Sequence, residues 1–336
     1  MDIVIGSLAF VFCVFCAGVM GFAIQRGATC TVAAVDEVIS KGTLRRLASL
    51  VEASVWVAGG LLVAQALQLL PKMPSGYALN QWTLLGGALL GLGALVNGAC
   101  VFGAIARFGS GQWAYAATPL GFYLGCLSVV PVFGPLKPEK LPEGSLVLQA
   151  PAWVAVLFVL FALWRLGRPL WNRADRGASV SWFKRLREAL ASHIWSPHAA
   201  TTVIGITFFF TVVLLGAWGY TDLLADLARG MSRSVVARCL MALGLVAGAV
   251  WGGWTAGRFQ STSVTAAQLL ACLAGGALMG WGTLLIPGSN DGLILIGMPL
   301  LWTYAWAAFV CMCLAIAAGK LAMRLGTRPL GQSGTS

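Results

Sequence analysis

The sequence predicts an all-α polytopic membrane protein. Hydrophobic residues make up 59% of the 336 residues and charged residues only 10%, and the mean hydropathy is +0.84. Soluble globular domains are far more polar than this. The charged residues gather in a few stretches, so that several other segments approach the roughly 20 apolar residues that a membrane-spanning helix needs.

Hydropathy and helix-breaking residues predict nine spans. These spans cover residues 3–24, 47–70, 83–108, 112–133, 150–167, 199–220, 234–257, 264–286 and 304–325. The first has no positively charged leader region, and we therefore interpret it as a retained span rather than a removable signal. An odd number of spans places the two termini on opposite sides of the membrane.

Basic residues fall on one side of this arrangement, which explains the formal charge of +11 without a nucleic-acid partner. They include Lys41, Arg45, Arg46, Arg107, Arg165, Arg168, Lys184, Arg185, Lys320 and Arg324. We expect this side to be cytoplasmic, with the N-terminus outside an inner membrane and the C-terminus inside. Residues 168–198 then form a cytoplasmic connector, with a short surface helix at 182–191, between membrane halves at 1–167 and 199–336.

Two segments fit neither a span nor a loop. Residues 28–40 and 287–298 are too short to cross a membrane, yet both carry polar residues at membrane depth. Such backbone is tolerated in lipid only where it lines a cavity enclosed by protein. We therefore predict re-entrant or broken helices in both places.

An internal repeat relates the two halves. The sequence GGALLGLG at 86–93 recurs as GGALMGWG at 275–282, and the same register aligns Cys100 with Ser289. A weaker match aligns residues 28–30 with 261–263. In the predicted span order the two glycine-rich copies run in opposite directions, as in the inverted repeats of many transporters. A miscounted span would make the repeat parallel, and glycine-rich similarity alone can arise by convergence.

Metal and enzyme motifs are not evident in the sequence. Seven of the nine cysteines lie in apolar runs and are predicted to be packing residues, including the CxxC pair Cys13 and Cys16. His193 and His198 lie in the connector without nearby partners for a metal. No GxxxxGK[ST] phosphate loop and no GxSxG nucleophile motif occur. We predict neither a cofactor nor enzyme activity.

Four motifs together resemble the YeeE/YedE family of sulfur-compound membrane transporters. They are GFAIQRGATC at 21–30, NGACVFG at 97–103, GRFQ at 257–260 and PGSNDG at 287–292. The resemblance implies an hourglass-like helical protein in which re-entrant segments meet near the centre and a line of cysteines contacts the passing anion. By motif, Cys30 and Cys100 correspond to two of these cysteines. Ser289 replaces the third, which leaves the exact substrate open.

The chemistry of these residues suits a small anion with a soft sulfur. A neutral thiol offers such an anion a polarizable contact and a weak donor, and helix breaks beside Gly98 and Gly288 expose N–H groups. The predicted substrate pathway contains Cys30, Cys100, Ser289, Arg26, Arg258, Asn97, Asn290, Gln25 and Gln260.

Each polar candidate also has a structural interpretation. The two arginines could instead anchor the protein at the interface, and the two asparagines could cap broken helices. Asp291 opposes an anion unless the carboxyl is protonated, paired or turned outward, and it could also bind a coupling proton.

Two functions follow from this pattern. The first is an inner-membrane permease for thiosulfate or a related sulfur or selenium anion, with a small cytoplasmic sulfur-carrier protein as a partner implied by the family resemblance. The alternative is a membrane sulfur-relay enzyme, in which Cys30 or Cys100 takes sulfur covalently and hands it to a soluble acceptor.

Overall fold

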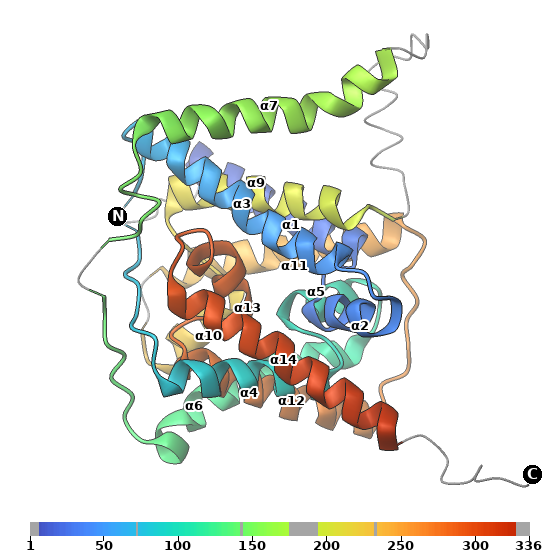
Figure 1. Cartoon of the computed structure of the whole chain (residues 1–336). Coiled ribbons are helices and arrows are strands. Elements are labelled where there is room, and N and C mark those ends of the chain that lie inside the picture. Colours follow the sequence, from blue (N-terminus) through green and yellow to red (C-terminus); the bar gives the residue numbers. More distant parts are fainter. Residues whose placement is uncertain (1–6, 72, 142–143, 175–193, 232–233, 327–336) are drawn as a thin grey trace, which may run out of the picture.

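The computed structural model describes residues 7–71, 73–141, 144–174, 194–231 and 234–326. Within these ranges the chain is helical and forms no β-strand, which confirms the predicted fold class (Figure 1). The predicted surface helix at 182–191 and His193 lie outside the described residues.

The helices fall into two series that resemble one another. The first half contains α1 (Leu8–Gly27), α2 (Thr31–Lys41), α3 (Arg45–Ala66), α4 (Gln81–Asn97), α5 (Val101–Gly109), α6 (Ala117–Phe133) and α7 (Ala152–Ala174). The second half contains α9 (Pro197–Leu215), α10 (Tyr220–Ala228), α11 (Val235–Thr255), α12 (Ala266–Leu285), α13 (Asn290–Gly292), a π-helical turn (Leu293–Gly297) and α14 (Thr303–Gly326).

Eight helical segments of the described chain are long and apolar enough to cross a membrane. They are Leu8–Lys41, Arg45–Ala66, Gln81–Gly109, Trp113–Phe133, Pro197–Leu215, Val235–Thr255, Ala266–Leu285 and Thr303–Leu325. The predicted span at 150–167 corresponds to α7, whose apolar part, Ala152–Gly167, is shorter than these eight. Helix α7 packs against α3 at one edge of the bundle (Figure 1).

The glycine-rich repeats pack directly on one another. The carbonyl oxygen of Gly282 lies 2.8 Å from the position that a Cβ on Gly86 would occupy, and the carbonyl oxygen of Gly275 lies 2.7 Å from the corresponding position on Gly93. Helices α4 and α12 are therefore antiparallel. Because the repeat aligns Gly86 with Gly275 and Gly93 with Gly282, a two-fold rotation exchanges these two contacts.

Other helix pairs obey the same symmetry. Helix α1 packs on α11 as α9 packs on α3, and α4 packs on α14 as α12 packs on α6. The two halves are thus related as an inverted repeat, which settles the direction that the sequence left open.

Four breaks interrupt the long helices. Residues 28–30 separate α1 from α2, residues 98–100 separate α4 from α5, residues 216–219 separate α9 from α10, and residues 286–289 separate α12 from α13. The chain turns at Gly98, whose φ of +73° lies in the left-handed region that glycine adopts readily. The breaks predicted at 28–40 and 287–298 are present.

The weaker sequence match between 28–30 and 261–263 is wrong in structural terms. Residues 261–263 lie in an exposed segment between α11 and α12, whereas the helix break that corresponds to 28–30 is at 216–219. The predicted span at 199–220 ends early because the break at 216–219 interrupts it. Helix α10 follows as a separate short helix. The structure also separates α5 from the predicted span at 83–108.

The two membrane faces are named here by the ends of α14, as the Thr303 face and the Gly326 face (left and right in Figure 1). Ion pairs fix α2 at the Gly326 face: Asp36 pairs with Lys320 at 3.3 Å and Glu37 with Arg46 at 3.0 Å.

The expectation that His198 has no carboxylate nearby is wrong. Glu52 on α3 contacts His198 on α9 and binds Arg165 on α7 at 3.2 Å. These contacts hold three helices together. The carboxylate is far away in the sequence, and only the packing of α3 against α7 and α9 brings it close.

Candidate functional site

Four helix N-termini meet inside the bundle. The residues that cap them are Cys30 on α2, Cys100 on α5, Gly219 on α10 and Ser289 on α13. Helix α5 contacts both α2 and α13. The N-terminal end of an α-helix carries partial positive charge, so α2, α5 and α10 together give this region a potential that suits an anion.

The two predicted thiols lie against one another. The backbone N–H of Thr31, the residue after Cys30, donates to Cys100 Sγ at 3.1 Å and so brings the two cysteines together. The sulfur of Cys30 lies 2.5 Å from the position that a Cβ on Gly103 would occupy. A glycine at position 103 therefore leaves room for the Cys30 sulfur beside α5.

Ser289 lies in a compact polar cluster. The hydroxyl of Thr221 is 2.8 Å from Ser289 Oγ and 2.5 Å from Asp291 Oδ1, and Ser289 Oγ also contacts Asp291 Oδ1. All three side chains are buried. The neighbouring Tyr220 hydroxyl donates to the carbonyl oxygen of Val101 at 3.3 Å, which joins the N-terminus of α10 to that of α5.

Cavities approach this centre from both faces. A cavity of about 320 Å³ on the Thr303 face is lined by Asp222, Arg238, Gly288, Gly292 and Tyr304 among others. On the Gly326 face, a cavity of about 10 Å³ lies against residues 27–30 and is lined by Arg46, Ser49 and Leu50. A third cavity of about 10 Å³ between the two is lined by Phe102, Tyr220 and Asp291. Each small cavity can hold about one water molecule.

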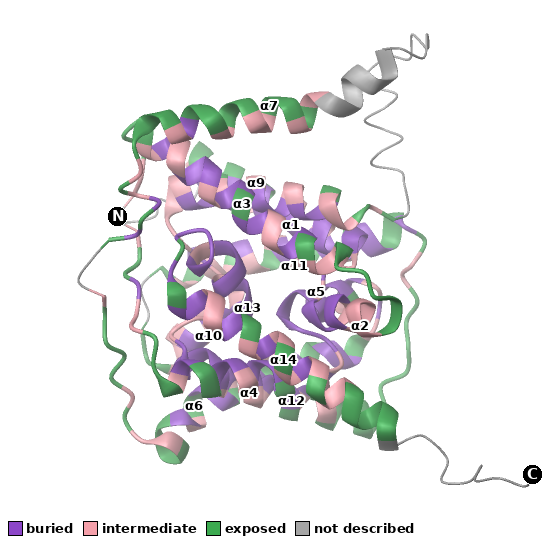
Figure 2. Ribbon diagram, viewed as in Figure 1, coloured by how far each residue is buried: buried purple, intermediate pink, exposed green. Residues whose placement is uncertain are grey.

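The centre itself is closed to solvent. Figure 2 shows buried residues concentrated in α5 and around α13, with exposed residues on the outer helices such as α7. The exposed large apolar side chains of those outer helices form the surface that lipid would cover.

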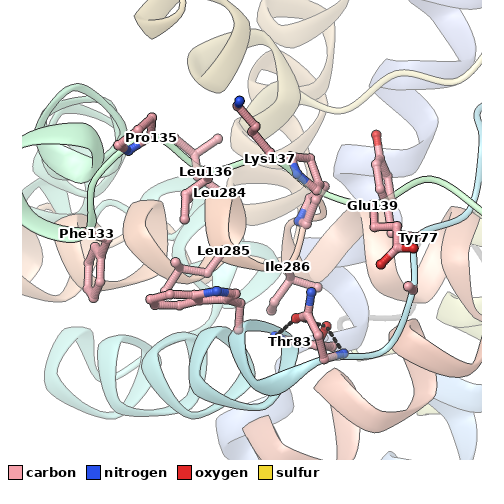
Figure 3. A pocket seen from close by; sticks show the side chains of 15 residues that line it. Tyr77, Thr83, Phe133, Pro135, Leu136, Lys137, Glu139, Leu284, Leu285 and Ile286 are labelled. Carbon is pink, nitrogen blue, oxygen red and sulfur yellow. Dashed lines mark hydrogen bonds between the residues drawn. The ribbon is translucent and has the colours of Figure 1, made fainter.

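A separate cavity of about 110 Å³ lies on the Thr303 face, beside the three cavities described above. Figure 3 shows that Tyr77, Phe133, Leu136 and Ile286 surround it and that Thr83 hydrogen-bonds at its floor. Of its described lining residues, Ile286 and Pro287 belong to a helix break. It shares Tyr77, Leu284 and Pro287 with the cavity of about 320 Å³, but none of the four capping residues lines it.

The structure places Gln25 and Arg26 away from the thiols. The Gln25 amide donates to Ser110 Oγ at 3.3 Å, and the Arg26 guanidinium donates to Thr255 Oγ1 at 2.8 Å and lies over the ring of Phe22. Both side chains are buried, and neither lines the cavities described above. Their contacts hold the end of α1 against α11 and the end of α5.

Arg258 and Gln260 lie in the segment that follows α11. Arg258 is partly exposed and Gln260 is exposed, and the backbone N–H of Gln260 donates to the carbonyl oxygen of Ser110 at 3.0 Å. The structure does not bring either side chain to the cavities around the thiols.

The two predicted asparagines differ. Asn97 donates to the carbonyl oxygen of Ala99 at 2.7 Å and accepts from Thr118 Oγ1 at 2.8 Å, so that it closes the break before α5. Asn290 is fully buried beside Ser289, and neither polar atom of its side chain has a hydrogen-bond partner among the described residues.

The sequence analysis missed Tyr220, Thr221 and Asp222. The available signal was the pair Gly216 and Gly219 after a span, followed at once by polar residues. Tyr220 begins α10 as Thr31 begins α2, so the correct symmetry would have pointed to the start of α10 and to these residues.

Comparison with known proteins adds an independent finding. A family model described as sulphur transport matches residues 26–318 of the chain. The matched region contains all four helix breaks and both thiols. No curated protein matches the chain.

Proposed function

Because the chain belongs to the sulphur-transport (YeeE/YedE) family, we propose that it is a channel-like permease for thiosulfate or a related small sulfur or selenium anion. The anion passes Ser289, Cys100 and Cys30 in turn. The protein does this without forming a covalent intermediate and is not an enzyme.

One observation carries this proposal: an unbroken series of contacts joins the cavities on the two faces. The cavity of about 320 Å³ reaches Gly288 and Gly292 on either side of Ser289. From there the contacts run through Tyr220 and Val101 to Cys100 and Cys30. Residue Cys30 lines the cavity on the Gly326 face.

The residues along this line favour loose binding of a soft anion. The thiols offer polarizable sulfur and weak S–H donors, and the helix N-termini supply partial positive charge without a full cation that would hold the anion tightly. Ser289 is a stronger and harder hydrogen-bond donor than a thiol. The permease therefore tolerates anions richer in oxygen, such as sulfite or sulfate, better than one with three cysteines would.

The charge distribution supports an inward orientation of the Gly326 face. Lys41, Arg45, Arg46, Lys320 and Arg324 all lie at that face, and such residues stay in the cytoplasm. The N-terminus then faces outward across the inner membrane. A small sulfur-carrier protein would receive the anion at this basic face.

Uptake by the purified protein in liposomes tests the proposal. Thiosulfate labelled at both sulfur atoms should enter intact, at a rate well above that of empty liposomes. Competition by unlabelled sulfite and sulfate ranks the substrates. Appearance of a persulfide on Cys30 or Cys100 during turnover, with no intact anion inside, would instead support the sulfur-relay enzyme.

A further inference from the structure

The polar cluster at Ser289 contains more contacts than hydroxyl protons. Thr221 Oγ1, Ser289 Oγ and Asp291 Oδ1 lie within hydrogen-bond distance of one another in all three pairs. Threonine and serine each supply one hydroxyl proton. Two protons can satisfy only two of the three contacts. The third contact becomes a hydrogen bond when the carboxyl of Asp291 also carries a proton.

A second carboxylate faces Asp291. The Oδ2 atom of Asp291 and the Oδ2 atom of Asp222 lie 2.9 Å and 3.0 Å from the position that a Cβ on Gly219 would occupy. The two oxygens are therefore within about 6 Å of each other, across a residue without a side chain. Two carboxylates at this separation disfavour double ionisation, because the like charges repel and because the Asp291 side chain is buried.

The cations near this pair lie beside Asp222, in the large cavity. Asp226 on α10 contacts Arg238 on α11, so these two residues compensate one another. Arg229, which directly follows α10, lines the large cavity together with Asp222. Two weaker acids face the pair: Tyr220 on α10 lies beside Asp291, and Tyr304 on α14 lines the large cavity with Asp222. Asp222 therefore has cations nearby, whereas the small cavity that Asp291 lines has no cation among its described lining residues.

Asp222 gives the pair access to solvent. Asp222 lines the cavity of about 320 Å³ on the Thr303 face, whereas Asp291 lines the small cavity next to Tyr220 and Phe102. A proton that enters from the large cavity can thus reach Asp291 through Asp222 and the hydroxyls of Thr221 and Ser289.

We propose that Asp222 and Asp291 form a proton-binding site and that the pathway conducts anions only while this site holds a proton. The binding site stands on the contacts above, and its effect on permeation rests on the proposed transport function. Without the proton, two carboxylates next to Ser289 repel a dianion. With the proton, the pair carries one negative charge instead of two. Each of the three contacts among Thr221, Ser289 and Asp291 can then be a hydrogen bond.

The sign of the pH effect follows directly. The protonated fraction rises as the pH on the Thr303 face falls, so uptake increases toward acidic pH. Above the titration midpoint of the site, uptake falls by up to a factor of about ten for each pH unit. In Asp291→Asn, the amide is neutral and nearly the same shape as the protonated acid, and its NH2 group can donate to both hydroxyls, so uptake should stay at its acidic-pH level across the whole range.

Two measurements on the full-length protein test this proposal. Infrared spectroscopy of the purified protein at neutral pH should show the carbonyl stretch of a protonated carboxylic acid, and Asp291→Asn should remove it. In liposomes, uptake of labelled thiosulfate should depend on external pH in the wild type and lose that dependence in Asp291→Asn. The exposed carboxylate variant Glu139→Gln should match the wild type in both measurements.

The outcomes separate the two proposals. If the carbonyl band is missing from the wild type or unchanged in Asp291→Asn, the proton site is refuted, whatever the transport result. Uptake that is the same at all pH values in the wild type would refute the gating role while leaving the permease intact. If the carbonyl band is present in the wild type and lost in Asp291→Asn, but the wild type shows no uptake, the proton site is established. The permease and the gating role are then both refuted.

Discussion

At the scale of single residues, the position of Ser289 is fixed by its neighbours. Its hydroxyl contacts both Thr221 and Asp291. A thiol at this position would donate more weakly to the carboxylate and present a softer surface to sulfur. The identity of residue 289 therefore decides which end of an anion such as thiosulfate it prefers.

Substitution at this position should change selectivity. We expect Ser289→Cys to raise uptake of thiosulfate relative to sulfite and sulfate, and Ser289→Ala to weaken uptake of every substrate, because the hydroxyl donor is lost. Competitive uptake of the three labelled anions by liposomes measures both effects. Identical selectivity in all three proteins would show that residue 289 does not touch the substrate.

Arg46 is the cation best placed to attract anions at the Gly326 face. It lines the same cavity as Cys30, whereas the predicted Arg26 and Arg258 do not. We expect Arg46→Gln to reduce uptake several-fold at low substrate and low salt, and to weaken the salt dependence of uptake. The neighbouring exposed residue supplies the control, because Arg45→Gln removes the same charge outside the cavity. Equal effects of the two variants would contradict this role.

At the scale of helices, the fit between α2 and α5 depends on the space at Gly103. A Cβ at this position would lie 2.5 Å from Cys30 Sγ and 3.0 Å from Cys30 Cβ. We therefore expect Gly103→Ala to displace the Cys30 thiol and strongly reduce uptake, with the protein still folded. Gly167→Ala on α7 is a matched control, since no atom lies within 4 Å of its added Cβ. Normal uptake by Gly103→Ala would show that transport does not depend on the contact between α2 and α5.

Helix breaks were only partly predictable from the sequence. The breaks at 28–30 and 286–289 were found because polar residues interrupt apolar segments there. The break before α5 was predicted from Gly98, but the predicted span at 83–108 still ran through it because the flanking residues are mostly apolar. The break before α10 was missed because a false match with residues 261–263 took its place in the repeat.

Contacts between helices explain the other differences. Arg26 and Gln25 belong to a motif at a helix break, and sequence alone gave no means of telling a pathway residue from one that bonds a neighbouring helix. Their partners, Thr255 and Ser110, are distant in the sequence. The carboxylate pair was missed for the same reason, because its members are distant in the sequence. Asp222 lies on α10 and Asp291 on α13, and only the folded structure brings them together.

At the scale of the whole molecule, the inverted repeat depends on close contact between α4 and α12. The backbone of Gly275 leaves no room for a side chain on Gly93. We expect Gly93→Ala to destabilise the protein by about 1–3 kcal/mol through overpacking. A lower midpoint of thermal unfolding than that of Gly167→Ala would confirm this. Equal midpoints of thermal unfolding would contradict close packing of α4 against α12 at Gly93.

The central claim is that the anion passes the buried thiol of Cys100. The most direct test compares uptake of labelled thiosulfate into liposomes by Cys100→Ala and by Cys311→Ala, with the amount of folded protein measured for each. Cys311 lies within α14 beside Gly87, and it caps none of the four helix N-termini that meet at the centre. The account predicts that Cys100→Ala abolishes uptake while Cys311→Ala transports as the wild type does. Normal uptake by folded Cys100→Ala would contradict it.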